Sequence, residues 1–383
     1  MKISGKLLLG IAAIMFAACD NDSPNPDPTP NPPGPSNTET LGAFVVNAGN
    51  MYNNIDGSLS YIAYAENKVY NNVFSSSNDN MKLGDTPNSG LVYEGEIYIA
   101  VTGSQVVQVV ELDGFKFVKT ISTDSYGAGP RHMTSYNGKI YMTLFKGTWG
   151  ISGEPGYLAE LDPETFAITR TVEVGPQPEY VVAFQDNLYI AVSDGYGDGS
   201  AACVAVVDPS TFTVTKRITA TDFVNPVNLV TNGTKLYVSS WGQYLNEAPY
   251  TQYNYGVYEI ASDELSAKVC DGIEIAMNGD YLYYISDPYR VDGTAPSYGV
   301  YNSATGVDNA NWIAPGNGVD YPVTLGASPI TGDVFILSYS LGEGGFVSYD
   351  LNGYVKQYKP DGTPVQTFEV GIDPTGIFFT TGM

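Results

Sequence analysis

The sequence predicts an all-β protein made of repeated four-stranded units, and three observations lead to this fold class. The first is composition: the 383 residues include 30 Tyr and 42 Gly, whereas charged residues make up only 15%. Chains rich in Tyr, Val and Thr favour strands, and glycines favour the tight turns between them. The second observation is an internal repeat. The third is that each end of the folded region holds only part of one repeat unit.

A turn that contains proline recurs along the chain at intervals of 43, 48, 48, 96 and 52 residues. The prolines are Pro87, Pro130, Pro178, Pro226, Pro322 and Pro374. The interval of 96 spans two units, with the missing turn near Gly272. A second mark, a tight turn followed by an aromatic residue, recurs in the same phase and fills this gap at Asn278-Gly279 and Tyr283. Four-stranded units that repeat every 40 to 50 residues or so are typical of a β-propeller.

Alternating apolar and polar residues, bounded by Gly, Asn, Asp and Pro, predict four short strands in each unit. In the unit that begins at Pro130, the expected strands are Met133–Tyr136, Lys139–Leu144, Gly156–Leu161 and Ala167–Val174. Strands a to d of such a unit run from the axis of the ring outward.

The two chain ends together supply the last unit. One strand, Thr375–Thr381, follows the final proline, and three strands, Gly42–Asn47, Ser58–Ala65 and Lys68–Phe74, precede the first. We therefore expect the carboxyl-terminal strand to join the amino-terminal blade as its inner strand. This count predicts a seven-bladed β-propeller with no free sheet edge. A ring of six or eight blades is the alternative if one seam is misplaced.

The residues before the propeller predict an export signal and a tether. Residues 1–18 combine a basic start with a short apolar run, as in a signal peptide. Ala17-Ala18-Cys19 resembles the lipobox of bacterial lipoproteins, so Cys19 is expected to be lipidated, unless the signal peptide is an ordinary one. Residues 19–41, which hold seven prolines between Asp20 and Thr40, predict a disordered tether ahead of the propeller domain, residues 42–383. The expected location is the outer membrane, facing the cell exterior.

Charge and residue counts exclude several classes of function. The net charge is -24 with only 17 basic residues, so phosphate backbones and anionic lipid surfaces would be repelled. No nucleic-acid partner is expected, and the membrane is expected to be reached through the lipid anchor only. A single histidine excludes histidine-rich metal sites, and three cysteines are too few for a disulfide scaffold. Cys203 and Cys270 are expected to be small buried apolar residues.

Long loops gather on one face of the predicted ring, where the b–c loops and d–a connections lie. The long b–c loops are Asn47–Gly57, Phe145–Pro155, Ser193–Ala201, Ser239–Tyr255, Ser286–Tyr298 and Ser338–Gly345. Aromatic side chains with polar tips, interspersed with amides, suit a polar-edged small molecule. The expected ligand-binding residues are Asn50, Tyr52, Arg131, His132, Trp149, Tyr180, Tyr196, Asn228, Trp241, Tyr244, Tyr289, Arg290 and Tyr321. Some of these tyrosines could instead fill gaps between loops.

Two features of this face allow a chemical alternative to ligand binding. His132 follows Arg131, but without a visible acid/base partner or nucleophile a structural histidine is favoured over a catalytic one. The segment Asp194–Gly199 has acidic residues in a glycine-rich loop and could hold calcium, but the EF-hand ligand pattern is absent. No catalytic residue, metal ligand or cofactor is therefore assigned.

The repeat resembles the YncE-like, or YVTN-type, seven-bladed propellers over about residues 42–383. Its first blade is similar to that of the BtuG-type surface lipoproteins of Bacteroidota. The stretches that carry this likeness are Asn47-Ala48-Gly49-Asn50, Gly57-Ser58-Leu59-Ser60-Tyr61, Lys82-Leu83-Gly84-Asp85, Pro130-Arg131 and Val370-Gly371-Ile372-Asp373-Pro374. The resemblance implies capture of a corrinoid such as cobalamin and its transfer to a TonB-dependent outer-membrane transporter. These stretches are mainly turns and blade seams, so they say more about architecture than about the ligand.

The sequence thus favours a non-catalytic surface lipoprotein that captures a small molecule. A protein- or glycan-binding adhesion module is the first alternative, and a propeller lyase or hydrolase is the second. Ligand capture predicts a concave aromatic site and adhesion predicts a flat exposed patch. Catalysis predicts clustered carboxylates, or His132 with a partner in a cleft.

Overall fold

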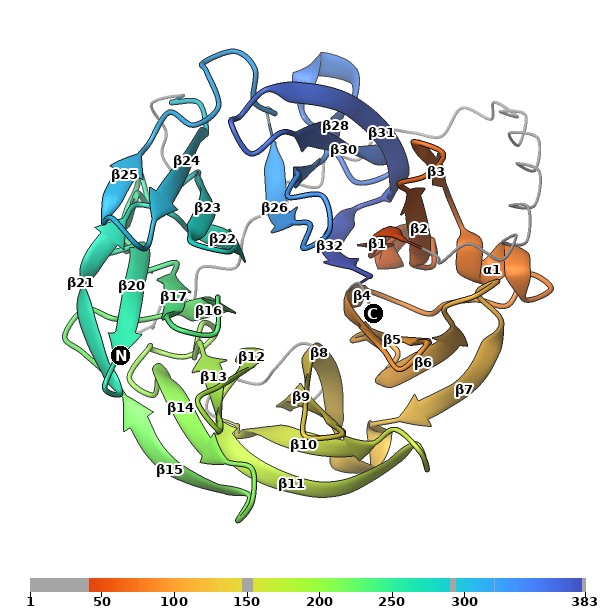
Figure 1. Ribbon diagram of the computed structural model, residues 1–383, viewed down its shortest axis with the longest axis horizontal. Coiled ribbons are helices and arrows are strands. Elements are labelled where there is room, and N and C mark those ends of the chain that lie inside the picture. Colours follow the sequence, from red (N-terminus) through yellow and green to blue (C-terminus); the bar gives the residue numbers. More distant parts are fainter. Residues whose placement is uncertain (1–40, 147–153, 290–293, 320, 381–383) are drawn as a thin grey trace, which may run out of the picture.

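The computed structural model, which describes residues 41–146, 154–289, 294–319 and 321–380, is a ring of seven four-stranded antiparallel sheets (Figure 1). The inner strands surround the axis, and those of neighbouring blades pack against one another. From the first blade to the seventh, these inner strands are β32 (Pro374–Phe379), β4 (Pro87–Tyr93), β8 (Ala128–Tyr136), β12 (Pro178–Phe184), β16 (Pro226–Thr231), β22 (Glu274–Asn278) and β26 (Pro322–Ala327). The predicted fold class and blade number are confirmed.

The remaining strands extend each blade outward. The first blade adds β1 (Gly42–Asn47), β2 (Ser58–Ala63) and β3 (Lys68–Tyr70). The second adds β5 (Glu96–Val101), β6 (Val106–Glu111) and β7 (Phe117–Ser122). The third adds β9 (Lys139–Lys146), β10 (Gly156–Asp162) and β11 (Ala167–Gly175). Blades four and five add β13 (Asn187–Val192), β14 (Cys203–Asp208) and β15 (Thr213–Ile218), and β17 (Leu236–Ser240), β20 (Gly256–Ala261) and β21 (Glu264–Cys270). Blades six and seven add β23 (Tyr281–Ser286), β24 (Ser297–Asn302) and β25 (Val307–Asn309), and β27 (Val334–Ser338), β30 (Asn352–Tyr358) and β31 (Pro364–Ile372).

Two small hairpins decorate the b–c loops of blades five and seven. They are formed by β18 (Gln243–Tyr244) with β19 (Gln252–Tyr253), and by β28 (Ser340–Leu341) with β29 (Val347–Ser348). Single-turn 3-10 helices lie at Met51–Asn53, Asp124–Tyr126 and Glu343–Gly345. No helix in the described part of the chain is both long and apolar enough to cross a membrane.

The ring closes as predicted, through the two ends of the chain. Strand β32 pairs antiparallel with β1, from Ala43 opposite Phe379 to Asn47 opposite Pro374. The Phe378 ring then stacks on Phe44 at a centroid distance of 5.2 Å. This closure removes the exposed sheet edges that an open seven-bladed array would leave.

The outer strand of the first blade is shorter than the sequence predicts. Strand β3 ends at Tyr70, and Val73–Ser77 form the short helix α1 instead of continuing the strand to Phe74. Asn72 has a φ of 55°, a left-handed conformation that stops the extended chain. Val73 and Phe74 are buried against the cluster that includes Phe115, so core packing explains the helix. Apolar alternation alone cannot distinguish these two ways of burying Phe74.

The aromatic position of the repeat lies on the second strand of its blade and is buried in every case. Its members are Tyr98, Tyr141, Tyr189, Tyr237, Tyr283 and Phe335. Several phenol groups donate a hydrogen bond to a nearby carboxylate; that of Tyr98 reaches Glu96 at 2.6 Å and that of Tyr189 reaches Asp263 at 2.8 Å. Tyrosine therefore serves the fold as an apolar body with a satisfied polar tip. Many of the 30 tyrosines belong to the core and not to the loop face.

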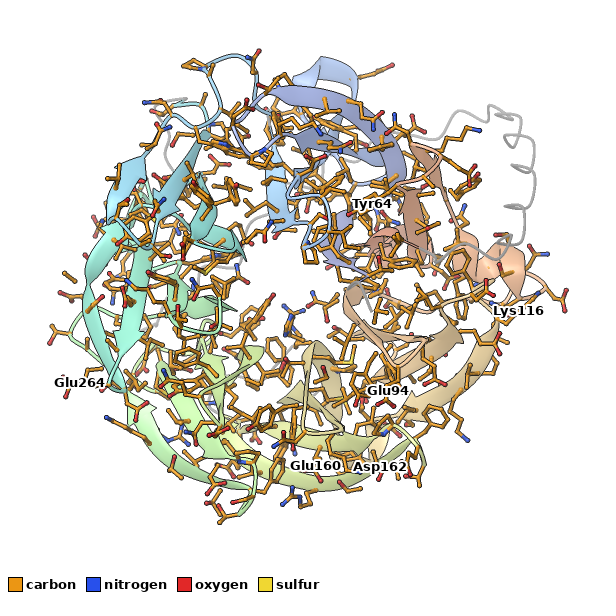
Figure 2. The ribbon with its side chains drawn as sticks, in the orientation of Figure 1. Tyr64, Glu94, Lys116, Glu160, Asp162 and Glu264 are labelled. Atoms are coloured by element: carbon orange, nitrogen blue, oxygen red, sulfur yellow. The ribbon has the colours of Figure 1, made fainter. Side chains whose placement is uncertain are left out.

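The cores lie between neighbouring blades, and charged side chains such as Lys116 and Glu264 lie toward the outer rim (Figure 2). Cys203 and Cys270 are free and buried, as predicted, and burial raises the pKa of the Cys270 thiol to about 12. At neutral pH this thiol stays protonated and behaves as a small apolar side chain.

Candidate functional site

A pocket of about 310 Å³ opens on the face that carries the long loops, called here the loop face. It is built from the b–c loops of blades five and six and from the start of the inner strand of blade seven. Its lining residues are Trp241, Tyr244, Gln252, Ile273, Glu274, Ile285, Asp287, Pro288, Tyr289, Thr294, Pro322 and Val323. The predicted site residues Trp241, Tyr244 and Tyr289 thus come together from two different blades.

These three aromatic side chains form the wall of the pocket. Trp241 is 36% exposed, Tyr244 40% and Tyr289 50%. The rings of Tyr244 and Tyr289 lie 6.4 Å apart between centroids and are inclined at 56° to each other. Neither ring stacks flat on the other, and both line the pocket. Large aromatic groups left exposed around a concavity indicate a binding surface.

Gln252 ties the two aromatic loops together and is buried. Its side-chain nitrogen donates to the Trp241 carbonyl at 2.5 Å, and its side-chain oxygen accepts from the Tyr289 N–H at 2.8 Å. Its own backbone N–H donates to the Tyr289 carbonyl at 3.0 Å. The small hairpin of β18 and β19 places Gln252 opposite Tyr244. These contacts hold the wall in place before any ligand arrives.

Glu274 forms the polar floor of the pocket. Its Oε2 accepts a hydrogen bond from the Asn228 side chain at 3.0 Å and another from the Thr324 hydroxyl at 3.0 Å. The Trp241 side chain also interacts with this carboxyl group. Burial raises the pKa of Glu274 to about 7, helped by the charge of Glu179, although the three neutral partners act in the opposite direction.

Neither Glu274 nor Gln252 was among the site residues expected from the sequence, but Glu274 had a detectable signal. In the six other blades, the pairing between the first and second strands shifts by one residue at the recurring proline, at or near the start of the inner strand. This shift is a β-bulge. Blade six has no such proline, and Glu274 pairs with Ile285 without a register shift. The start of this inner strand therefore departs from the pattern of the other six blades. Such a departure indicates that the position has a role beyond forming the turn. Gln252 had no comparable signal, because its partners come from two separate loops.

The polar groups of blades three and four lie on neighbouring inner strands. Arg131 pairs with Glu179 at 2.8 Å and covers the Phe145 ring at 4.6 Å. The rings of His132 and Tyr180 stack with centroids 3.4 Å apart. Burial lowers the pKa of His132 to about 3, opposed only by a hydrogen bond with the Val181 backbone, and raises the pKa of Tyr180 to about 12. Both groups are therefore neutral at physiological pH.

The other predicted ligand residues lie apart from the pocket or outside the described residues. Asn50 caps the Met51–Asn53 helix and donates to Asp350 at 2.7 Å, so it joins the loops of blades one and seven. Tyr52 and Tyr196 are exposed on the loops of blades one and four. Tyr321, also exposed, directly precedes the lining residue Pro322. Trp149, Arg290 and the lipidation candidate Cys19 fall outside the described residues.

The glycine-rich loop of blade four uses its carboxylates within the loop. Asp194 accepts a hydrogen bond from the Ala201 N–H at 3.1 Å, and Asp198 accepts one from the Ser200 N–H at 2.9 Å. Within the described residues, no three His, Cys, Asp or Glu side chains lie close enough to hold a metal ion together.

Solved structures share this architecture at low sequence identity. A functionally unknown protein from Desulfotomaculum acetoxidans aligns with 88% of this chain and 98% of its own, at 13% identity and a TM-score of 0.58. The computationally designed Ika8 protein aligns with 90% of this chain and 92% of its own, at 9% identity and a TM-score of 0.53. A Bacteroides fragilis protein described as "a putative 6-phosphogluconolactonase" covers 91% of this chain and 100% of its own, at 13% identity and a TM-score of 0.49. At these identities the likeness concerns the fold alone.

Comparison with known families identifies the chain more directly than these structures do. No curated protein matches it. One family model, described as Domain of unknown function (DUF5074), matches residues 41–370, which is nearly the whole propeller. The chain therefore belongs to the DUF5074 family, with a seven-bladed β-propeller as its fold.

Proposed function

We propose that the protein is a non-catalytic binding protein that captures a small molecule in the pocket of blades five to seven. The observation that supports this most is the convergence of Trp241, Tyr244 and Tyr289, all partly exposed, around one concavity of about 310 Å³. Gln252 holds this wall rigid, and Glu274 adds one polar group at its floor. A concavity that combines aromatic walls with fixed polar groups is a common form of a ligand site.

The polar groups on this face are arranged to hold a ligand and not to react with it. Arg131 is already paired with Glu179, and Glu274 accepts hydrogen bonds from Asn228 and Thr324. His132 is a very weak base, because its pKa is lowered to about 3. General acid–base catalysis near neutral pH works best with a group whose pKa lies close to that pH. These observations disfavour catalysis by His132. Glu274, whose pKa of about 7 would suit such a role, is engaged by Asn228, Thr324 and Trp241, so we propose binding over a lyase or hydrolase activity.

We further propose that the protein works as a lipid-anchored receptor at the cell surface and delivers its ligand to an outer-membrane transporter. This part of the proposal comes from the lipobox-like Ala17-Ala18-Cys19 and the resemblance of the first blade to the BtuG-type lipoproteins. A complete corrinoid is larger than the pocket, whose volume is at the small end of the range for ligand sites. A corrinoid would therefore lie across the mouth, with one edge inserted.

Calorimetric titration of the purified domain tests the binding function. The ligands are cobalamin, cobinamide and a set of small polar metabolites, and the variants are Trp241→Ala and Tyr281→Ala. Tyr281 is an exposed aromatic residue at the a–b turn of blade six, away from the pocket lining, so it serves as a matched control. We expect Trp241→Ala to weaken binding roughly 30-fold, about 2 kcal/mol, and Tyr281→Ala to leave it unchanged. Equal affinity in the parent and Trp241→Ala would contradict the placement of the site.

A second candidate function, protein binding, is favoured by an exposed apolar patch over blades seven and one. Tyr52 is 79% exposed and Phe346 is 77% exposed. Their loops are joined by hydrogen bonds from Asn50 and Asn53 to Asp350, so the two side chains belong to one surface. Such patches mark contact sites for other proteins.

We propose that this patch contacts the transporter. The combined variant Tyr52→Ser and Phe346→Ser should then co-purify less with a transporter from solubilised outer membranes, while its pocket still binds ligand. Undiminished co-purification would remove the patch from the proposal.

A further inference from the structure

We infer that the ligand of the pocket of blades five to seven carries an alkylated ammonium group. The aromatic wall and the carboxylates at the floor of the pocket would bind this group jointly. This inference rests on the proposed binding function and specifies the chemical class of the ligand. It is an alternative to the corrinoid suggested by the resemblance, because corrinoid side chains are amides and carry no alkylated ammonium group. Three features of the pocket support it: the arrangement of its rings, the chemistry of its floor and the charge of its surroundings.

The rings are arranged to enclose a cation. The Tyr244 and Tyr289 rings, 6.4 Å apart and inclined at 56°, form two sides of a corner, and Trp241 lines the same space. Aromatic faces carry negative electrostatic potential and attract cations within about 6 Å of the ring centre, and Trp is the strongest of them.

The floor presents carboxylates to this corner. Glu274 and Asp287 both line the pocket, from the inner strand and the b–c loop of blade six. An ionised carboxyl group has about four acceptor positions. At Glu274, only three are taken up by neutral partners on Asn228, Thr324 and Trp241, which leaves acceptor capacity for a ligand. The described lining residues include no Lys, Arg or His side chain.

The surroundings also favour a positive ligand. The chain carries a net charge of -24, which attracts cations toward its surface at long range. On the inner strands of blades three and four, the Arg131 cation is paired with Glu179. Burial raises the pKa of Glu274 to about 7, so its negative charge is poorly compensated in the free protein. A bound cation would supply the missing compensation.

Choline and its neutral carbon isostere, in which a carbon atom replaces the nitrogen, provide a direct test. The two probes have nearly the same shape and differ in charge. Titration of the parent protein at a pH above neutrality, followed by NMR because the affinities are expected to be millimolar, should show choline binding at least about 10-fold more tightly than the isostere. The chemical-shift changes should map to residues around Trp241 and Tyr289.

Two carboxylate variants then separate the pocket from the general charge of the protein. Glu274→Gln should weaken choline binding several-fold and leave the isostere unchanged. Glu264→Gln removes the same charge on outer strand β21, at the rim of the ring (Figure 2), and should alter neither. If Glu274→Gln were destabilised, titration of the parent below pH 6, where the Glu274 carboxyl group is protonated, would provide the same comparison.

Each outcome supports or overturns the inference. Equal affinity for choline and the isostere, the same loss in Glu274→Gln and Glu264→Gln, or no binding of choline would overturn it. If choline fails but a neutral or anionic metabolite binds and depends on Trp241, the proposed binding function stands and only the ligand class is wrong. If no small molecule binds in a Trp241-dependent way, both proposals fail.

Discussion

Burial between the blades shifts the pKa values of single side chains in opposite directions, depending on whether the group is a base or an acid. His132 and Glu274 both lie on inner strands, and burial acts on both. The ring of His132 stacks on Tyr180 and its pKa falls to about 3, whereas the pKa of Glu274 rises to about 7. In both cases burial disfavours the charged form. Only Glu274 lines the pocket, and only its titration falls near physiological pH.

The raised pKa of Glu274 makes a prediction about stability and pH. Its carboxyl group has a reference pKa of 4.5 and a folded-state pKa of about 7. The folded state therefore holds the proton more tightly, so stability is lost as pH rises from 4.5 to about 7 and then levels off. Glu274→Gln cannot ionise, and we expect it to exceed the parent in free energy of unfolding by about 3 kcal/mol above this range and to match it below.

Urea unfolding of both proteins across this pH range measures the difference. Glu179 and Tyr180 interact electrostatically with Glu274, Arg131 is paired to Glu179, and Asp287 lines the same pocket. They are present in both proteins, so their own titration contributes to both curves, whereas their interaction with the Glu274 charge is part of the measured difference. Glu264→Gln, at the exposed rim, shows what removal of an ordinary surface carboxylate does. A stability difference independent of pH would contradict the assignment.

At the scale of elements, the closing strand β32 contributes contacts to three blades at once. It pairs with β1 within its own sheet, and the Phe378 ring packs so closely on β4 that a Cβ atom at Gly90 would lie 2.3 Å from it. On the other side, the Phe379 ring lies 5.8 Å from that of Phe335 in blade seven. The strand therefore joins the first blade to both of its neighbours.

Deletion of the residues from Thr375 onward should destabilise the whole ring and not merely loosen one end. The deletion exposes the buried face of Phe44 and leaves β1 as a free sheet edge. Thermal unfolding followed by circular dichroism should show a lower melting temperature, and gel filtration should show association. Deletion of residues 1–40, which precede the ring, is the control. An unchanged melting temperature in the shortened protein would contradict the closure mechanism.

At the scale of the whole molecule, the chain enters the ring on the face opposite the pocket. Strand β1 begins at Gly42 and runs toward the loop face, where Asn47 lies opposite Pro374. If Cys19 is the anchor, residues 19–40 join the membrane to the far face of the ring. Their proline-rich composition predicts an extended tether, for which about 3 Å per residue gives a reach of roughly 60 Å, enough to let the ring turn its loop face toward a transporter.

Anchoring through Cys19 is directly testable. We expect Cys19→Ala to leave the outer-membrane fraction of its native host and to appear as a soluble protein, with the propeller folded and its ligand affinity unchanged. Fractionation followed by immunoblotting measures the distribution, and Cys203→Ala serves as a control because that cysteine is buried in β14. If Cys19→Ala still partitions with the membrane as the parent does, the lipoprotein assignment is wrong.

The sequence by itself determined the repeat, the number of blades and the way the ring closes. These properties follow from local patterns. Each unit of about 50 residues contains the alternation of apolar and polar residues along its strands, the turn residues and the buried aromatic position. Their agreement in phase makes the architecture predictable. That Trp241, Tyr244 and Tyr289 share one face was predictable for a related reason, because all three lie in b–c loops.

Only the tertiary structure decided which loop residues share a pocket. Gln252 and Glu274 act through partners from other blades, and Asn50 proves to be a helix cap that joins two loops. The tertiary structure also decided how Phe74 is buried. A helix and not a strand places this side chain in the core. The physical reason is that the distances between loops are set by the packing of neighbouring blades and by the seam bulges, and neither leaves a regular period in the sequence.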